Sequence, residues 1–166
     1  MDPPKYQAIL AKDIPVVPLT PSDAADAAKL TGENSVRVIA ADESLFGVKG
    51  AASTHTPVEL LDIRMATKGV NFDVPIPDGH QTIVFVRRGK ITVGEKESPV
   101  EQQGVALMHL SGTTLRLAAA EDHTEVLLLG GEPIDEPIAA RGPFVMNTHE
   151  EIIQANRDFM NGNMGQ

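Results

Sequence analysis

Apolar residues alternate with polar ones along several short segments of the chain. In the segment 58–66, Leu61, Ile63 and Met65 alternate with Asp62 and Arg64. This period of two is typical of a strand with one buried face. Further strand-like segments lie at 35–41, 45–50, 82–94 (two strands joined at a glycine turn), 104–110, 113–118 and 124–129. Many short strands with turn residues between them predict an all-β fold, an antiparallel sandwich or barrel, rather than alternating strands and helices.

The two ends of the chain differ from this pattern. The prolines of the segment 12–19 allow only an edge strand, because proline cannot donate a backbone hydrogen bond. We therefore expect residues 1–34 to form an N-terminal arm with a possible edge strand. Near the other end, Thr148 and Glu151 have the spacing of a capping box, which predicts a helix over 149–160.

Three regions follow from these elements. We expect the arm at 1–34, one β domain at 35–146, and a C-terminal helix and tail at 147–166. A length of 166 residues suits a single domain.

Composition narrows the classes of partner. A net charge of -9 disfavours direct binding to nucleic acid, whose phosphates repel an acidic surface. The absence of cysteine excludes disulfides and thiolate metal sites. The first residues, MDPPKY, lack the apolar region of a secretory signal, and the longest apolar run, 126–131, is too short to span a membrane. We expect a soluble, cytoplasmic protein (nuclear if the source is eukaryotic) with no membrane partner.

The histidines offer few signs of catalysis. None of the five forms an HxH pair or a helical i, i+4 pair, and no GxSxG nucleophile motif is present, so we name no catalytic residue. His55, His80 and His109 are the candidates for contact with a ligand in a pocket. We expect His55 to hydrogen-bond its own loop and His80 to be a solvated turn residue, with contact at a pocket mouth as the alternative. We place His109 in the core or at its rim, because it alternates with Val105 and Leu107.

An apolar interior is expected to fill the domain, and a small organic ligand inside it stays open as the alternative. The candidate lining residues are Leu61, Ile63, Met65, Val84, Val86, Leu107, Leu115 and Leu117.

The segment 127–162 resembles the end of pirin family proteins. The resemblance is carried by GEP at 131–133, EP at 136–137 and GPFVMNT at 142–148, and upstream by VRVIA at 36–40, LFGVKG at 45–50 and THTPVELLDIR at 54–64. It covers nearly the whole chain from Pro4 onwards. It implies a single cupin (jelly-roll) β-barrel with a C-terminal helix, similar to the second barrel of a pirin. The first barrel, which holds iron or a similar metal in that family, has no counterpart in this sequence.

The same resemblance allows a search for metal ligands. In the family's register, one ligand pair falls on Pro75 and Pro77 and the other on Leu117 and Ala119, while a generic cupin pattern selects Leu115. None of these side chains can coordinate a metal. The resemblance therefore implies that this chain holds no metal and no cofactor.

Three functions are compatible with this interpretation. One is a metal-free interaction or structural module that forms a homodimer or binds another pirin or cupin chain. Another is a transcription coregulator that binds a transcription factor. The alternative is part of a quercetin 2,3-dioxygenase-like pirin whose catalytic metal lies in a missing or partner barrel. We expect the chain alone not to be an enzyme.

Overall fold

The computed structural model describes residues 6–164, so the first five residues of the predicted arm and the last two of the predicted tail lie outside it. The chain divides into two compact units. The larger unit spans Ala8–Pro133, and the described residues from Ile134 to Met164 belong to the smaller one. The division therefore falls at 133/134, whereas the sequence suggested boundaries at 34/35 and 146/147.

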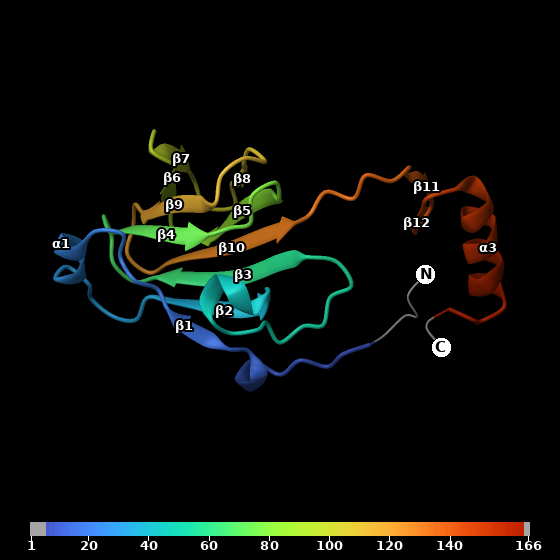
Figure 1. The fold of residues 1–166 in the computed structure, drawn as a ribbon, viewed down its shortest axis with the longest axis horizontal. Coiled ribbons are helices and arrows are strands. Elements are labelled where there is room, and N and C mark those ends of the chain that lie inside the picture. Colours follow the sequence, from blue (N-terminus) through green and yellow to red (C-terminus); the bar gives the residue numbers. More distant parts are fainter. Residues whose placement is uncertain (1–5, 165–166) are drawn as a thin grey trace. The chain divides into compact units, whose positions relative to one another are not determined.

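The larger unit is an antiparallel β-sandwich (Figure 1). Its first sheet has the strand order β1 (Val16–Pro18), β2 (Ser35–Ala40), β3 (Val58–Met65), β10 (Thr124–Gly131), β5 (Gln81–Arg88) and β8 (Val105–Leu107). Its second sheet has the order β4 (Asn71–Pro75), β9 (Thr114–Ala119), β6 (Ile91–Val93) and β7 (Ser98–Val100). The predicted all-β fold is confirmed, as two facing sheets rather than a fully closed barrel. The possible edge strand of the arm corresponds to β1, which pairs only with β2.

The core lies between these two sheets. Alternate residues of each long strand point inward, and Leu61, Val84 and Leu128, from three neighbouring strands, are fully buried. Seven of the predicted lining residues are buried in this core: Leu61, Ile63, Met65, Val84, Val86, Leu115 and Leu117.

The eighth predicted lining residue, Leu107, is 67% exposed, so its assignment to the interior was wrong. Strand β8 is a sheet edge, and Ala106 and Met108 are the residues that pack against the core. A shift of one residue in strand phase turns every side chain to the other face. His109 shares the outward phase of Leu107 and is exposed, which contradicts its predicted place in the core or at its rim.

The segment 45–50 was also wrongly assigned, because no strand forms there. The structure has a short helix, α2 (Glu43–Phe46), in which the Asp42 side chain accepts a hydrogen bond from the backbone N–H of Ser44. Gly47 ends the helix with a φ of 68°, a left-handed conformation that glycine adopts without strain. The N-cap residue Asp42 favours a helix here, although the composition of the segment is typical of a strand.

The remaining helices of the larger unit are short: the 3-10 turn η1 (Ala11–Asp13) and α1 (Ala24–Ala27). No helix within residues 6–164 is long and apolar enough to cross a membrane.

The smaller unit contains a hairpin and a helix. Strands β11 (Ala139–Arg141) and β12 (Phe144–Met146) pair with each other, and α3 (His149–Met160) follows. Thr148 and Glu151 form the complete capping box, so the predicted C-terminal helix is confirmed. The rings of Phe144 and Phe159 meet edge to face, with their centroids 6.0 Å apart.

Candidate functional site

One end of the sandwich interior is polar. Glu59 of β3 lies opposite Gly130 of β10, and Gly130 lies opposite Thr82 of β5. Residues directly opposite each other share a face of the sheet, and the next row on this face is the fully buried set Leu61, Leu128 and Val84. The apolar core therefore ends in a row that carries a carboxylate and a hydroxyl.

Glu59 and His80 form a hydrogen-bonded pair at this polar row. His80 Nδ1 lies 2.9 Å from Glu59 Oε2, and the two side chains are only 11% and 4% exposed. Gly130 makes room for the pair, because a Cβ at that position would lie 2.5 Å from Glu59 Oε2. A carboxylate buried this deeply requires a partner, and His80 provides it.

The hydroxyl of Thr82 completes the row. Thr82 is 1% exposed, and its Oγ1 has no hydrogen-bond partner among the residues that the structure describes. Buried side-chain hydroxyls usually have a partner. The polar end of the interior is therefore incompletely satisfied by the protein itself.

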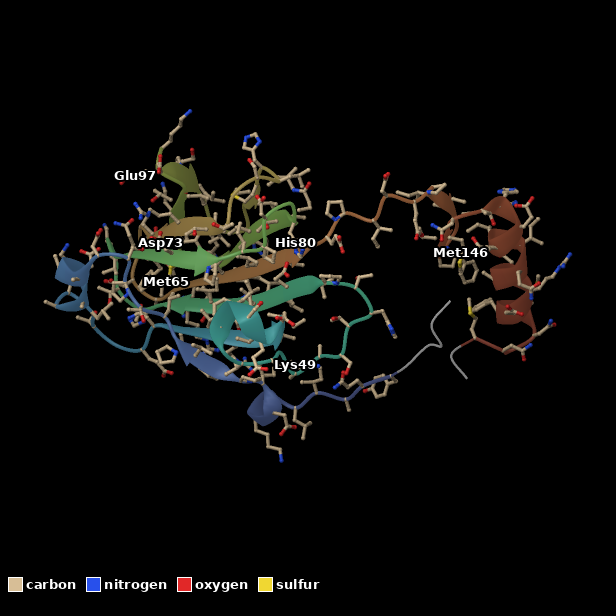
Figure 2. All side chains as sticks on the ribbon, in the orientation of Figure 1. Lys49, Met65, Asp73, His80, Glu97 and Met146 are labelled. Carbon is tan, nitrogen blue, oxygen red and sulfur yellow. The ribbon has the colours of Figure 1, made fainter. Side chains whose placement is uncertain are left out.

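A pocket of about 580 Å³ opens beside the Glu59–His80 pair. Helix α2 and the loop from Lys49 to Val58 form most of its wall, and Pro77 and His80 close the other side. Figure 2 shows Lys49 and His80 toward the same end of the larger unit. At the rim, hydrogen bonds from the backbone N–H and the side chain of Ser44 lower the pKa of Asp42 below its ordinary value.

The structure brings two of the three candidate histidines together. His55 and His80 both line this pocket, whereas His109 lies outside it on the exposed edge of the sheet. His80 is more enclosed than a solvated turn residue would be. Glu59 was missed, although it occupies the inward phase of the alternation that continues with Leu61 and Ile63.

The positions at which the family register seeks a metal hold no donor atoms. Leu117 and Ala119 are buried in the core, and Pro75 and Pro77 are half-buried near the turn before β5. In the part of the chain that the structure covers, no group of three or more histidine or acidic side chains converges as a metal site would require. The residues present therefore do not fit a cupin metal.

A second pocket, of about 710 Å³, lies on the outer face of the six-stranded sheet and is bordered by charged residues. Beside it, Asp62 accepts hydrogen bonds from Arg37 at 3.4 Å and Arg87 at 2.6 Å, and Arg87 also pairs with Glu125. Arg37, Asp62, Arg87 and Glu125 thus form a connected set of ion pairs beside this pocket.

The sandwich and its end pocket define the cupin class of fold. A crystal structure of a quercetin 2,3-dioxygenase from Acinetobacter baumannii superposes on the whole chain with a TM-score of 0.81 at 38% identity, and the match covers 52% of that protein. Residues 60–165 match the Pirin C-terminal cupin domain, and this chain belongs to the pirin family.

Relatives of known sequence agree with this assignment. A Pseudomonas aeruginosa protein provisionally named a quercetin 2,3-dioxygenase is 40% identical over 162 residues, which is 98% of this chain and 51% of the relative. Human pirin is 30% identical over 166 residues, with the same coverage. The chain thus spans about half the length of the curated relatives it matches.

Proposed function

We propose that this chain serves as the metal-free cupin domain of a pirin-type quercetin 2,3-dioxygenase, whose catalytic metal is bound by residues outside this sequence. The observation that carries the proposal is the set of side chains at the metal positions. Proline, leucine and alanine occupy all four of them, although the chain resembles dioxygenase-named proteins over almost its whole length. In this role the domain binds no metal itself and associates with the barrel that holds the catalytic metal.

Exposed apolar side chains in the smaller unit support association with such a barrel. Val145 is 66% exposed, Phe159 64% and Met160 77%. A hairpin and one helix of this size are marginally stable by themselves, and exposed apolar groups favour contact with another surface. We infer that a metal-carrying cupin barrel of the same family covers them, and that a homodimer is the competing arrangement.

A partner-binding role without oxygenation is the second candidate function. The same exposed side chains favour it, because they would serve a structural or coregulator complex as well as an enzyme. Either role is compatible with a reducing compartment such as the cytoplasm, because a chain without cysteine does not depend on disulfide bonds for its stability.

Reconstitution with a metal-carrying barrel tests the proposal. The half of the Pseudomonas relative that this chain does not match would be loaded with iron and mixed with the purified chain. We expect the chain alone to contain substoichiometric metal by elemental mass spectrometry and to leave quercetin intact under oxygen. We expect the mixture to form a complex and to consume quercetin faster than the loaded half alone.

The outcomes separate the candidates. Stoichiometric metal in the chain alone, with loss of quercetin, would overturn the metal-free assignment. A complex with no gain in quercetin consumption would favour the partner-binding role. The double variant Phe159→Ser, Met160→Ser should weaken the complex if these side chains lie in the interface, and Lys96→Ser on the larger unit is the matched control.

A further inference from the structure

A β-bulge brings two consecutive arginines to the outer face of the six-stranded sheet. Alternate residues of β5 up to Val86 point inward, so a regular strand would turn Arg88 inward as well. Val126 of β10 lies opposite Val86. The residue before it, Glu125, lies opposite Arg88, so Arg87 is the extra residue of the bulge and Arg88 is exposed on the outer face. Bulges are over-represented next to active sites, where they redirect a side chain.

The bulge completes a row of charged side chains across three strands. Glu125 of β10 lies directly opposite Arg64 of β3 on one side and Arg88 of β5 on the other. Neighbouring strands are about 4.8 Å apart, so the backbones that carry the two arginines are roughly 10 Å apart. Both arginines line the pocket of about 710 Å³, as do Lys12 of η1 and Arg37 of β2. Four cations therefore border one concave surface of a chain whose net charge is -9.

The nearby carboxylates do not neutralise all of these cations. The connected ion pairs beside the pocket consist of two arginines and two carboxylates, so their charges balance. Lys12, Arg64 and Arg88 lie outside that set, and none of the three forms an ion pair with a residue that the structure describes. The lining leaves one other carboxylate, Glu33, against these three cations. The pocket therefore carries an excess of positive charge that a bound anion would neutralise.

Hydrogen bonds hold the walls of this pocket in place. Arg37 Nη2 donates to the carbonyl oxygen of Ala11 at 3.5 Å, which ties η1 to β2. The side-chain oxygen of Asn34 accepts from the backbone N–H of Ala66 at 2.8 Å. The backbone N–H of His123 donates to the carbonyl oxygen of Ala66 at 3.2 Å. The loops on both sides of the end of β3 are thus attached to that strand, so the pocket is formed before a ligand binds, as is usual for small-molecule sites.

The lining groups narrow the class of anion. Guanidinium groups bind phosphate and carboxylate through two parallel hydrogen bonds, and they stay charged at any physiological pH. Three cations against one carboxylate favour a ligand with several negative charges. A phosphate monoester carries about -1.5 to -2 charges at pH 7, more than a carboxylate. A volume of about 710 Å³ suits a small molecule, whereas a long polyanion would also meet the acidic remainder of the surface.

We propose that this pocket binds a small phosphorylated molecule whose diphosphate group lies between Arg64 and Arg88. Each guanidinium donates hydrogen bonds to one phosphate, and the Lys12 ammonium adds attraction from the wall. Glu33 and Glu125 repel the anion and so limit its affinity. The site lies on the outer face of the sheet, away from the positions at which the family register seeks a metal, so it does not depend on the proposed dioxygenase role.

Isothermal titration calorimetry with inorganic pyrophosphate tests the site. In low salt without divalent cations, we expect saturable binding at one site per chain, with an affinity that falls as sodium chloride is added. Arg64→Gln and Arg88→Gln should each weaken binding about tenfold, as expected for loss of hydrogen bonds between charged groups. Lys96→Gln removes the same charge from an exposed turn outside the pocket, so this matched control should bind as the wild type does.

Glu33→Gln separates the effect of charge from loss of structure. Removal of this carboxylate should tighten pyrophosphate binding about threefold, because a like charge no longer faces the anion. A damaged fold would not bind more tightly. If an arginine variant fails to fold, as judged by circular dichroism, Glu33→Gln still decides the matter, and unchanged or weaker binding by this variant would overturn the site.

Other anions identify the occupant. Tighter binding of ADP than of pyrophosphate would support an organic diphosphate, and equal binding would support recognition of the diphosphate group alone. Malonate, a dicarboxylate, should bind at least several-fold more weakly than pyrophosphate, and equal affinity would overturn the assignment to phosphate. The whole proposal fails if neither pyrophosphate nor ADP binds saturably, or if both folded arginine variants keep the wild-type affinity.

Discussion

A single missing side chain allows the sandwich interior to end in a hydrogen-bonded pair of polar side chains. Gly130 lies between Glu59 and Thr82 in the sheet, and the Glu59 carboxylate occupies the space that a side chain at residue 130 would fill. The position of the Glu59 carboxylate therefore depends on a residue that has no side chain.

Gly130→Ala should displace the Glu59 carboxylate. The added Cβ would lie 2.5 Å from Oε2 and 3.3 Å from the Cβ of Glu59, so the hydrogen bond to His80 is lost. We expect a loss of about 1–2 kcal/mol in the free energy of unfolding, as for other overpacked interiors, measured by urea denaturation. The control is Gly131→Ala, whose Cβ meets its nearest neighbour, Val58, at an ordinary 3.4 Å. Equal stability of the two variants would show that the carboxylate moves without cost.

Gly50→Ala tests the wall of the pocket at the same scale. Its Cβ would lie 2.5 Å from the backbone nitrogen of Ala41 and 2.6 Å from the Cα of Ala40, and backbone atoms inside a sandwich cannot move aside as a side chain can. We expect a loss of about 3 kcal/mol. Gly47→Ala meets no atom within 4 Å and should cost only the left-handed backbone, about 1 kcal/mol. Thermal unfolding of the two variants would compare them, and the larger loss in Gly47→Ala would contradict this account.

Among the elements, strands β4 and β9 are joined by a cross-strand ion pair. Asp73 and Arg116 lie directly opposite each other, and the Asp73 carboxylate accepts from Arg116 Nε at 2.8 Å and Nη2 at 2.9 Å. The hydrogen bonds from Arg116 lower the pKa of Asp73 below its ordinary value, and those same bonds raise the pKa of Arg116.

Asp73→Asn should therefore have an effect that depends on pH. Because the pKa of Asp73 is lowered in the folded state, the unfolded chain binds the proton more readily, and stability rises with pH. The ion pair contributes its full stabilisation above the ordinary pKa of an aspartate, near pH 4. This stabilisation is lost as the pH falls through the lower pKa that Asp73 has in the folded state. Both side chains are partly exposed, so we expect a difference of about 0.5–1 kcal/mol at pH 7 that salt reduces. Urea denaturation at pH 7 and pH 3 measures it, and an equal difference at both would refute the ion pair.

Period-two alternation predicted the long strands because one face of each lies against a continuous core. It succeeded for β3, where inward Leu61, Ile63 and Met65 are fully buried. It did not identify β7, whose three residues include Pro99 and give too little pattern. It misjudged β8, because both faces of that edge strand carry apolar residues and only the fold shows which face is covered.

The candidate site was less predictable, because its contacts join distant parts of the sequence. His80 could be selected from the sequence as a histidine at the entrance to a strand. Its partner, Glu59, is 21 residues away on β3, whereas His80 directly precedes β5, and β3 and β5 do not pair with each other. Strand β10 lies between them, and Gly130 allows the contact. Local patterns carry information about strand phase, whereas this pair depends on the order of strands in the sheet.

At the scale of the whole molecule, the hydrophobic core belongs to one unit alone. Its cluster runs from Leu19 to Leu128, within Ala8–Pro133. In the smaller unit, Ile152 and Ala155 of α3 are buried outside that cluster. The sandwich should therefore obtain its stability without residues beyond 133.

A chain ending at Pro133 should fold into the same sandwich. We expect its urea-unfolding free energy to stay within about 1 kcal/mol of the full chain, because every inward column of the two sheets is retained. Full-length Leu128→Ala is the comparison and should lose about 3 kcal/mol, since Leu128 is completely buried in the central strand. The shortened chain also lacks Phe159 and Met160, so it should bind a metal-carrying barrel more weakly. A shortened chain that unfolds more easily than Leu128→Ala would show that the stability of the sandwich depends on the smaller unit. This result would contradict the assignment of the core to the larger unit alone.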